Sequence, residues 1–247
     1  MMDDIRAKIC ANFLKEEMEK WKISNKVTAI VSDNVNNIVA AVQSGGWRHI
    51  GCFTHTLNLV VQVGISEIQT TVTKVKNIVE FFKRSSQAQV KLQEMQKQMN
   101  LPVLKLKQDV VTRWNSTYDM LNRVVSRKDA VIATLALVRH ELALNTTEWQ
   151  VVQEAIPILK SFYEVATKIS TEKQVSLSKV IVYSRLLHQH ISNCNLEVYS
   201  PEAQKMITSL KAQVHRRFYD KSDVESNVLY AEDTILDPRF KKEVSET

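Results

Sequence analysis

The chain has 247 residues, of which 44% are hydrophobic and 24% charged, so it is long enough to bury a core and too apolar for a disordered protein. No run approaches the about 18 apolar residues of a transmembrane helix, and the acidic, amphipathic N-terminus is unlike a signal peptide. Only four glycines are present, and both G-x-G-x-x-G and G-x-x-x-x-G-K are missing, which excludes glycine-rich phosphate loops. The absence of G-x-S-x-G and of H-E-x-x-H argues against serine hydrolases and zinc proteases. Three widely spaced cysteines are typical of free thiols in a reducing compartment.

Positive charge is concentrated in the middle of the chain. The net charge is +6, but residues 73–128 hold 12 Lys and Arg against four Asp and Glu, a net charge of +8. A basic segment in an otherwise nearly neutral protein indicates a polyanionic partner such as nucleic acid. The alternative is a solvated helix face rich in lysine.

The first elements predict a helix followed by a strand–helix–strand unit. Apolar residues at helical spacing run from Ile5 to Trp21 and predict an amphipathic helix. Residues 26–32 are short and β-branched and predict a buried strand, residues 34–44 return to helical spacing, and residues 47–53 predict a second strand. This order is typical of two parallel strands joined by a crossover helix.

Asp33 follows the first predicted strand directly. The carboxyl end of a parallel strand is where α/β folds place functional groups. A single carboxylate, however, neither holds Mg²⁺ tightly nor supports two-metal chemistry. The alternative is a helix cap, in which Asp33 or Asn34 begins the helix to Ser44.

Beyond His55 the pattern predicts helices almost throughout. One apolar face recurs at alternating four- and three-residue spacing and is expected to pack on a neighbouring helix: Ile68, Val72, Val75, Val79 and Phe82. Ser116 and Asp119 have the spacing of a capping box at the start of a helix that runs to Leu135. Ser200 followed by Pro201 predicts a further helix start.

Two groups of residues are candidates for binding. Cys52 and His55 form a C-x-x-H pair, but tetrahedral zinc needs four ligands, so we expect no zinc and interpret the pair as a buried thiol and a helix-capping histidine. Arg113 and Trp114 lie in the basic segment, where arginine binds phosphate and tryptophan stacks on bases. The alternative for Trp114 is a core side chain, with Arg113 at the surface.

Four motifs together resemble those of hAT-superfamily transposases, and most closely those of the vertebrate zinc finger BED domain-containing proteins derived from them. In chain order they are VTAIVSDNVNN around Asp33, GCFTHTLNLVVQ, DVVTRWNSTYDML and LDPRFK. The resemblance implies an RNase H-like fold interrupted by a large all-helical insertion. It also implies an Asp-Asp-Glu triad that binds two metal ions and cuts DNA, in which Asp33 matches the second aspartate.

The chain departs from this family pattern. Of the three expected carboxylates, only Asp33 is identified. The first aspartate should lie on an earlier strand, but only a helix precedes the strand of Asp33, and the glutamate should follow the insertion, but LDPRFK lies close to Thr247. We therefore expect the middle part of such a protein, mostly α with a small α/β part: a truncated RNase H-like remnant at residues 1–65 and an all-helical insertion at residues 66–247. The BED zinc finger is expected to be absent, with no cofactor, since Mg²⁺ or Mn²⁺ would serve only an intact transposase.

The expected function is non-catalytic. We expect part of a nuclear, transcription-regulator-like protein that associates with DNA or chromatin weakly and electrostatically through Arg113, Trp114, Lys105 and Lys107. A homo-oligomer is possible on this interpretation, whereas a membrane or a small-molecule substrate is not expected. The alternatives are a DNA transposase whose first Asp and last Glu lie outside this chain, and a helical protein-interaction module that uses the face from Ile68 to Phe82.

Overall fold

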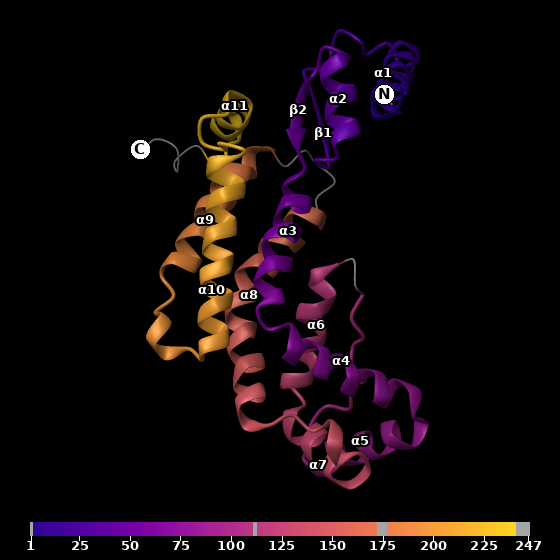
Figure 1. Ribbon diagram of the computed structural model, residues 1–247, viewed down its shortest axis with the longest axis vertical. Coiled ribbons are helices and arrows are strands. Elements are labelled where there is room, and N and C mark those ends of the chain that lie inside the picture. The colour runs from indigo at the N-terminus through magenta and orange to yellow at the C-terminus, as the bar shows by residue number, and fades with distance from the viewer. Residues whose placement is uncertain (1, 111–112, 172–176, 241–247) are drawn as a thin grey trace. The chain divides into compact units, whose positions relative to one another are not determined.

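The computed structural model describes residues 2–110, 113–171 and 177–240, which divide into two units, Met1–Leu57 and Asn58–Thr247. The division falls inside helix α3 (Phe53–Ser66), earlier in the chain than the boundary after residue 65 that the sequence predicted. The described residues are mostly helical, with one small sheet, as expected (Figure 1).

The first unit contains the predicted strand–helix–strand. Helix α1 (Met2–Lys20) is followed by β1 (Ala29–Ser32), α2 (Asn36–Ser44) and β2 (Arg48–Gly51). The two strands are parallel, with Ala29 opposite Arg48 and Ser32 opposite Gly51. Both strands are shorter than predicted, and β1 is not buried as expected: Val31 is 52% exposed.

The apolar face predicted for α1 is buried only in part: Met18 is 8% exposed and Cys10 packs against buried alanines, but the larger residues of the first turns are not buried. Ile5, Ile9 and Phe13 are 54%, 62% and 61% exposed, whereas Ala7 and Ala11 are buried together with Ala41 of α2. Small side chains let two helix backbones approach closely, and this contact turns the large apolar residues of α1 away from α2. Hydrophobic spacing alone identified the helix but only part of the side that it buries.

In the part of the second unit that the structure describes, all regular secondary structure is helical, and non-helical segments such as residues 101–110 connect the helices. Its remaining helices are α4 (Gln69–Arg84), α5 (Ser86–Gln98), α6 (Trp114–Val125), α7 (Lys128–Val138), α8 (Thr146–Thr171), α9 (Val180–Ser192), α10 (Pro201–Val214) and α11 (Val228–Leu236). Short 3-10 turns, at His140–Leu142, Leu177–Lys179 and Leu196–Val198, and a π-helical turn at His215–Asp220 join some of them. Helix α8 packs against α4, α6, α9 and α10, so it forms the centre of this unit.

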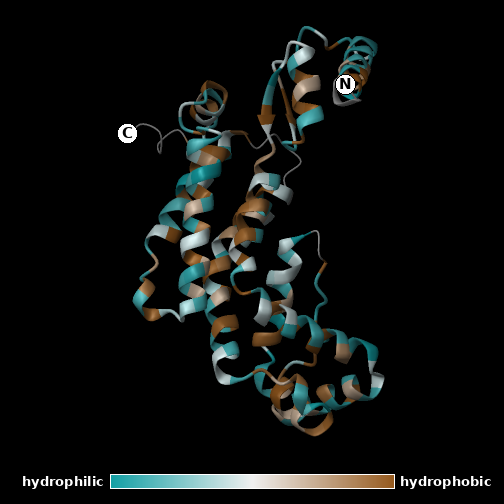
Figure 2. Ribbon diagram, in the orientation of Figure 1, coloured by the Kyte–Doolittle hydropathy of each residue, from teal (hydrophilic) through white to brown (hydrophobic). Residues whose placement is uncertain are grey.

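The apolar face from Ile68 to Phe82 is buried, as its spacing predicted. All five of its residues are at most 2% exposed, and α4 packs against α5, α6 and α8. Figure 2 shows how hydrophobic and hydrophilic residues alternate along α4, as expected for a helix with one buried side. Because this face already lies inside the unit, the interpretation in which it binds another protein is wrong for this conformation.

Two predicted helix starts have different outcomes. Ser200 is the N-cap of α10, accepts from the backbone N–H of Ala203, and precedes Pro201, as predicted. The capping box at Ser116 is wrong, because α6 begins at Trp114 and Ser116 Oγ instead bonds to the segment before the helix. That predicted helix is also two helices, since α6 ends at Val125 and α7 begins at Lys128.

Candidate nucleic-acid interface and the aspartate at the sheet edge

Asp33 lies exposed at the carboxyl end of β1. Ser32, the last residue of that strand, accepts from the backbone N–H of Cys52 at 2.7 Å through its carbonyl, and its Oγ lies 2.9 Å from His49 Nε2 of β2. The parallel pairing therefore brings the residues after both strands, Asp33 and Cys52, to the same edge of the sheet. This is the edge at which α/β folds place functional groups.

The helix-cap alternative for Asp33 is wrong. The residue at the N-cap of α2 is Val35, which has an extended backbone, and no side chain caps the helix there. Asn34 instead places its carboxamide against Gly51, where a Cβ atom would lie only 2.7 Å from Asn34 Oδ1. Asp33 is thus a surface carboxylate that the local fold does not use as a cap.

Among the described residues, no group of three His, Cys, Asp or Glu side chains is placed to hold a metal ion. Cys52 is half-buried before α3, its carbonyl accepts from the N–H and Oγ1 of Thr56, and His55 lies half-buried in the first turn of that helix. In the second unit, Cys194 Sγ donates to the carbonyl of His190.

A buried aspartate that the sequence did not single out organises the DVVTRWNSTYDML motif. The side chain of Asp109 is 4% exposed; its Oδ1 accepts from Ser116 Oγ and Thr117 Oγ1, and its Oδ2 lies 2.6 Å from Lys76 Nζ. Burial raises the pKa of Asp109, but the hydrogen bonds from Lys76, Thr117 and Ser116 and the charge of Lys76 outweigh it, so the pKa lies below its usual value. Asp109 thereby fixes the start of α6 to α4.

Trp114 is a core residue, which corrects the expectation that it stacks on DNA bases. It is 4% exposed, and its ring meets that of Tyr163 edge to face, with centroids 6.4 Å apart. Tyr163 in turn stacks on Tyr118, at 4.4 Å between centroids, and donates to Asp119 Oδ1. An indole enclosed in this way has no open face for a base, so the core alternative holds.

The other predicted DNA-binding residues are at the surface. Arg113, Lys105 and Lys107 are all exposed. Lys107 forms an ion pair with Asp119 at 3.0 Å, so part of its charge is neutralised. The backbone carbonyl of Lys105 accepts from Arg123 Nη1 at 3.0 Å, which ties this residue to α6.

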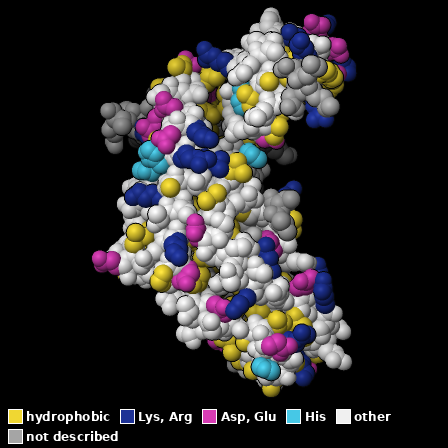
Figure 3. Space-filling view, viewed as in Figure 1, with side chains coloured by type: hydrophobic (Ala, Val, Ile, Leu, Met, Phe, Trp, Pro, Cys, Tyr) yellow, Lys and Arg dark blue, Asp and Glu magenta, His cyan; other side chains and the backbone are white. Residues whose placement is uncertain are grey.

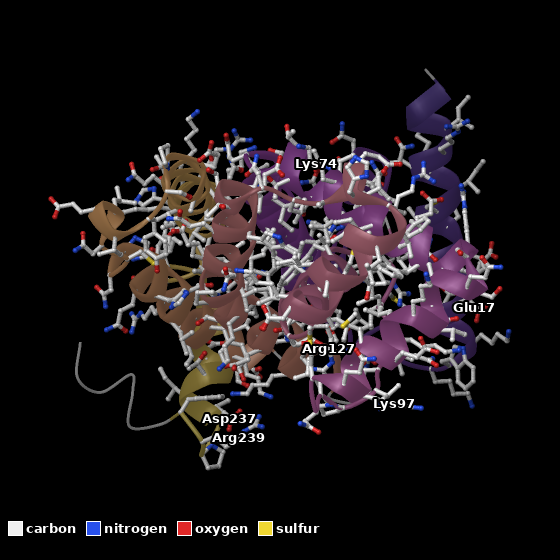
Figure 4. The ribbon with its side chains drawn as sticks, turned by 90° about the horizontal axis from the view of Figure 1, so that it is seen from below. Glu17, Lys74, Lys97, Arg127, Asp237 and Arg239 are labelled. Carbon is white, nitrogen blue, oxygen red and sulfur yellow. The ribbon has the colours of Figure 1, made fainter. Side chains whose placement is uncertain are left out.

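The structure separates the cations of the basic segment into paired and free ones. Lys74, Lys76, Arg84 and Lys107 face carboxylates. Arg127 is buried, and its Nη1 donates to the carbonyl of Ser126, whereas Lys97 points away from the helices (Figure 4). Within the described part of residues 73–128, five exposed cations face no carboxylate: Lys83, Lys91, Lys97, Lys105 and Arg113.

On the face of the molecule that Figure 3 shows, Lys and Arg side chains are interspersed with Asp and Glu and form no continuous stripe. Near the C-terminus, Arg239 of the LDPRFK motif is paired with Asp237, beside which it lies in Figure 4. This hydrogen bonding lowers the pKa of Asp237 and makes Arg239 part of a local turn.

Comparison with known proteins shows which proteins this chain is similar to. Residues 50–157 match the family model described as the ZBED1 RNase-like helical domain. Zinc finger BED domain-containing protein 4 of Homo sapiens is 28% identical over 239 residues, which cover 93% of this chain and 20% of that protein. The putative AC transposase of Zea mays is 28% identical over 247 residues, covering 91% of this chain and 30% of that protein.

The similarity covers most of this chain but only a small part of each relative. Zinc finger BED domain-containing protein 6 of Mus musculus is 32% identical over 173 residues, which cover 68% of this chain and 17% of that protein. The chain thus spans from less than a fifth to under a third of the length of these curated relatives. Over most of its own length it is similar to zinc finger BED domain-containing proteins and to hAT-type transposases, which confirms the resemblance seen in its motifs.

Proposed function

We propose that this chain is a non-catalytic, transposase-derived part of a nuclear, transcription-regulator-like protein that associates with DNA. The observation that carries the proposal is the set of five exposed cations on the helical unit that face no described carboxylate. Such charges bind phosphates without reading sequence. We expect no small-molecule substrate, and no described helix combines the length and apolar character that crossing a bilayer needs.

The proposed architecture is an RNase H-like fold that a helical insertion interrupts. Two observations support it: the parallel strand–helix–strand of the first unit, and the match of residues 50–157 to a family described as RNase-like and helical. The proposed absence of catalysis rests on Asp33. One exposed carboxylate does not position two metal ions, so it does not stabilise the charge that develops during strand cleavage.

Salt dependence of DNA binding tests the proposal. Each neutralised phosphate of B-DNA lowers the slope of log K against log salt by about 0.9, so five contacts predict a slope of about −4 to −5. Fluorescence anisotropy of the full chain with a labelled duplex, measured between 50 and 200 mM salt, gives this slope directly. No binding at 50 mM salt, or a slope near zero, would contradict the proposal.

A variant that removes three of these charges locates the contact. Replacing Lys91, Lys97 and Lys105 with glutamine should make the slope less negative by about 2 to 3, since three phosphate contacts are lost. The control is a triple glutamine variant of Lys8, Lys15 and Lys22, which are exposed in the first unit and change the net charge equally. Equal effects of the two variants would show that net charge, and not the helical unit, determines binding.

The second candidate is a DNA transposase whose first Asp and last Glu lie outside this chain. The similarity to the putative AC transposase of Zea mays, which covers 91% of the chain, favours it. In that case Asp33 would be one member of a complete triad, and metal ions would bind only when the other two carboxylates are present. Metal-dependent cleavage of DNA separates the two candidates.

A further inference from the structure

A groove lies on the helical unit between α4, α5 and the extended segment 101–110. Its volume is about 390 Å³. Leu104 of the segment, which is 37% exposed, gives the groove an open apolar surface, and the buried side chains of Val79, Phe82 and Leu92 lie at its base. Two lysines, Lys83 of α4 and Lys105 of the segment, also line it. This volume lies near the lower end of the roughly 300–1,000 Å³ of ligand pockets, so it suits one small planar group and not a duplex.

Hydrogen bonds hold the walls of this groove in place. The buried Gln96 of α5 donates from Nε2 to the carbonyl of Leu104 at 3.1 Å and accepts the N–H of Leu104 at 2.8 Å. Arg123 of α6 donates to the carbonyl of Lys105, and Lys83 donates across the groove to the carboxamide of Gln108. Side chains of three helices, α4, α5 and α6, therefore hold the segment in place by hydrogen bonds. The groove is thus formed before any ligand binds.

The lining of the groove combines positive charge with free amides. It contains no Asp or Glu. Gln89 and Gln93 lie one turn apart on α5, line the groove and are half-buried, and their carboxamides have no hydrogen-bond partner within the described residues. A carboxamide offers a donor and an acceptor side by side, which matches the donor and acceptor pattern along the edge of a nucleobase.

We propose that this groove, between α4, α5 and residues 101–110, binds one unpaired nucleotide of single-stranded DNA. Lys83 and Lys105 bind the phosphate, and the base lies against the exposed side chain of Leu104. Gln89 and Gln93 form hydrogen bonds with the edge of the base. A base within a duplex cannot enter, because its neighbours cover both of its faces. This inference rests on the proposed DNA association and adds to it a preference for single strands.

Single-stranded and duplex DNA distinguish this contact from general electrostatic binding. The full chain and its variants are titrated into a labelled 12-nucleotide single strand and the matching duplex at one salt concentration. The double variant Gln89→Leu with Gln93→Leu changes no charge, and Gln93→Trp fills the groove. The control, Gln87→Leu with Gln98→Leu, changes two exposed glutamines of α5 that do not line the groove.

Both groove variants should weaken single-strand binding by roughly tenfold, the loss expected for one good bidentate base contact. Duplex binding should change less than twofold in the same variants, and the control should change neither. If both groove variants bind the single strand as the wild type does, or lose both substrates equally, the inference is wrong. Duplex binding by the wild type then still supports the proposed function, whereas a wild type that binds neither substrate contradicts both.

Discussion

Replacing Trp114 with alanine should destabilise the protein strongly. The side chain is 4% exposed and packs edge to face on Tyr163, so its removal leaves a large cavity in the core. Truncating a buried tryptophan to alanine costs about 3–5 kcal/mol. Since 1 kcal/mol shifts the melting temperature of a domain of this size by about 2–4 °C, a fall of about 6–20 °C is expected.

Urea and thermal unfolding followed by circular dichroism measure this loss without relying on tryptophan fluorescence. Trp21→Ala is the matched control, because Trp21 is 69% exposed and its removal should change stability by less than about 0.5 kcal/mol. DNA affinity of the folded Trp114→Ala protein should fall by the same factor on single-stranded and duplex DNA. Unchanged stability together with a selective loss of single-strand binding would refute the assignment of Trp114 to the core.

Three further predictions follow from named residues. Asp109→Asn should lower the unfolding free energy near neutral pH by about 1.5–3 kcal/mol, the range for hydrogen bonds to a charged group. Because the folded pKa of Asp109 is lowered, this stabilisation is present above the usual value of 3.8 and is lost as the pH falls through the folded pKa. A difference between wild type and variant in urea unfolding that did not shrink at low pH would contradict the ion pair. The purified chain should lack stoichiometric zinc, since Cys52 and His55 supply two ligands; about one zinc per chain, lost in Cys52→Ser, would overturn this. The edge of β1 away from β2 pairs with no described strand, so Val31→Lys should reduce self-association in light scattering. A monomeric wild type whose slowest-exchanging amides are those of residues 27–31 would count against the exposed edge.

The sequence predicted features that depend on residues close together in the chain. The face from Ile68 to Phe82, the cap at Ser200 and the parallel strand–helix–strand all follow from spacing and from side-chain chemistry within one or two elements. Because the two strands are parallel and Ser32 lies opposite Gly51, the residues that follow them, Asp33 and Cys52, come to the same end of the sheet.

Other features depend on contacts between distant residues, which spacing does not reveal. Asp109 joins α4 to the start of α6 because Lys76 of α4 forms an ion pair with it. Ser116 Oγ donates to Asp109 and therefore does not form the predicted capping box. In α1, the close contact of Ala7 and Ala11 with α2 outweighs the larger apolar residues that the periodicity favoured. The pairing of Lys107 with Asp119 likewise shows that charge counted along the chain overstates the charge available to DNA.

Nicking of supercoiled plasmid tests most directly the claim that this chain binds DNA without cutting it. The full chain is incubated with plasmid and Mn²⁺ at low salt, where binding is strongest, beside Asp33→Asn protein. We predict that the wild type retards the plasmid in a gel and leaves it supercoiled, and that Asp33→Asn behaves identically. Metal-dependent nicking by the wild type that disappears in Asp33→Asn would contradict the non-catalytic assignment.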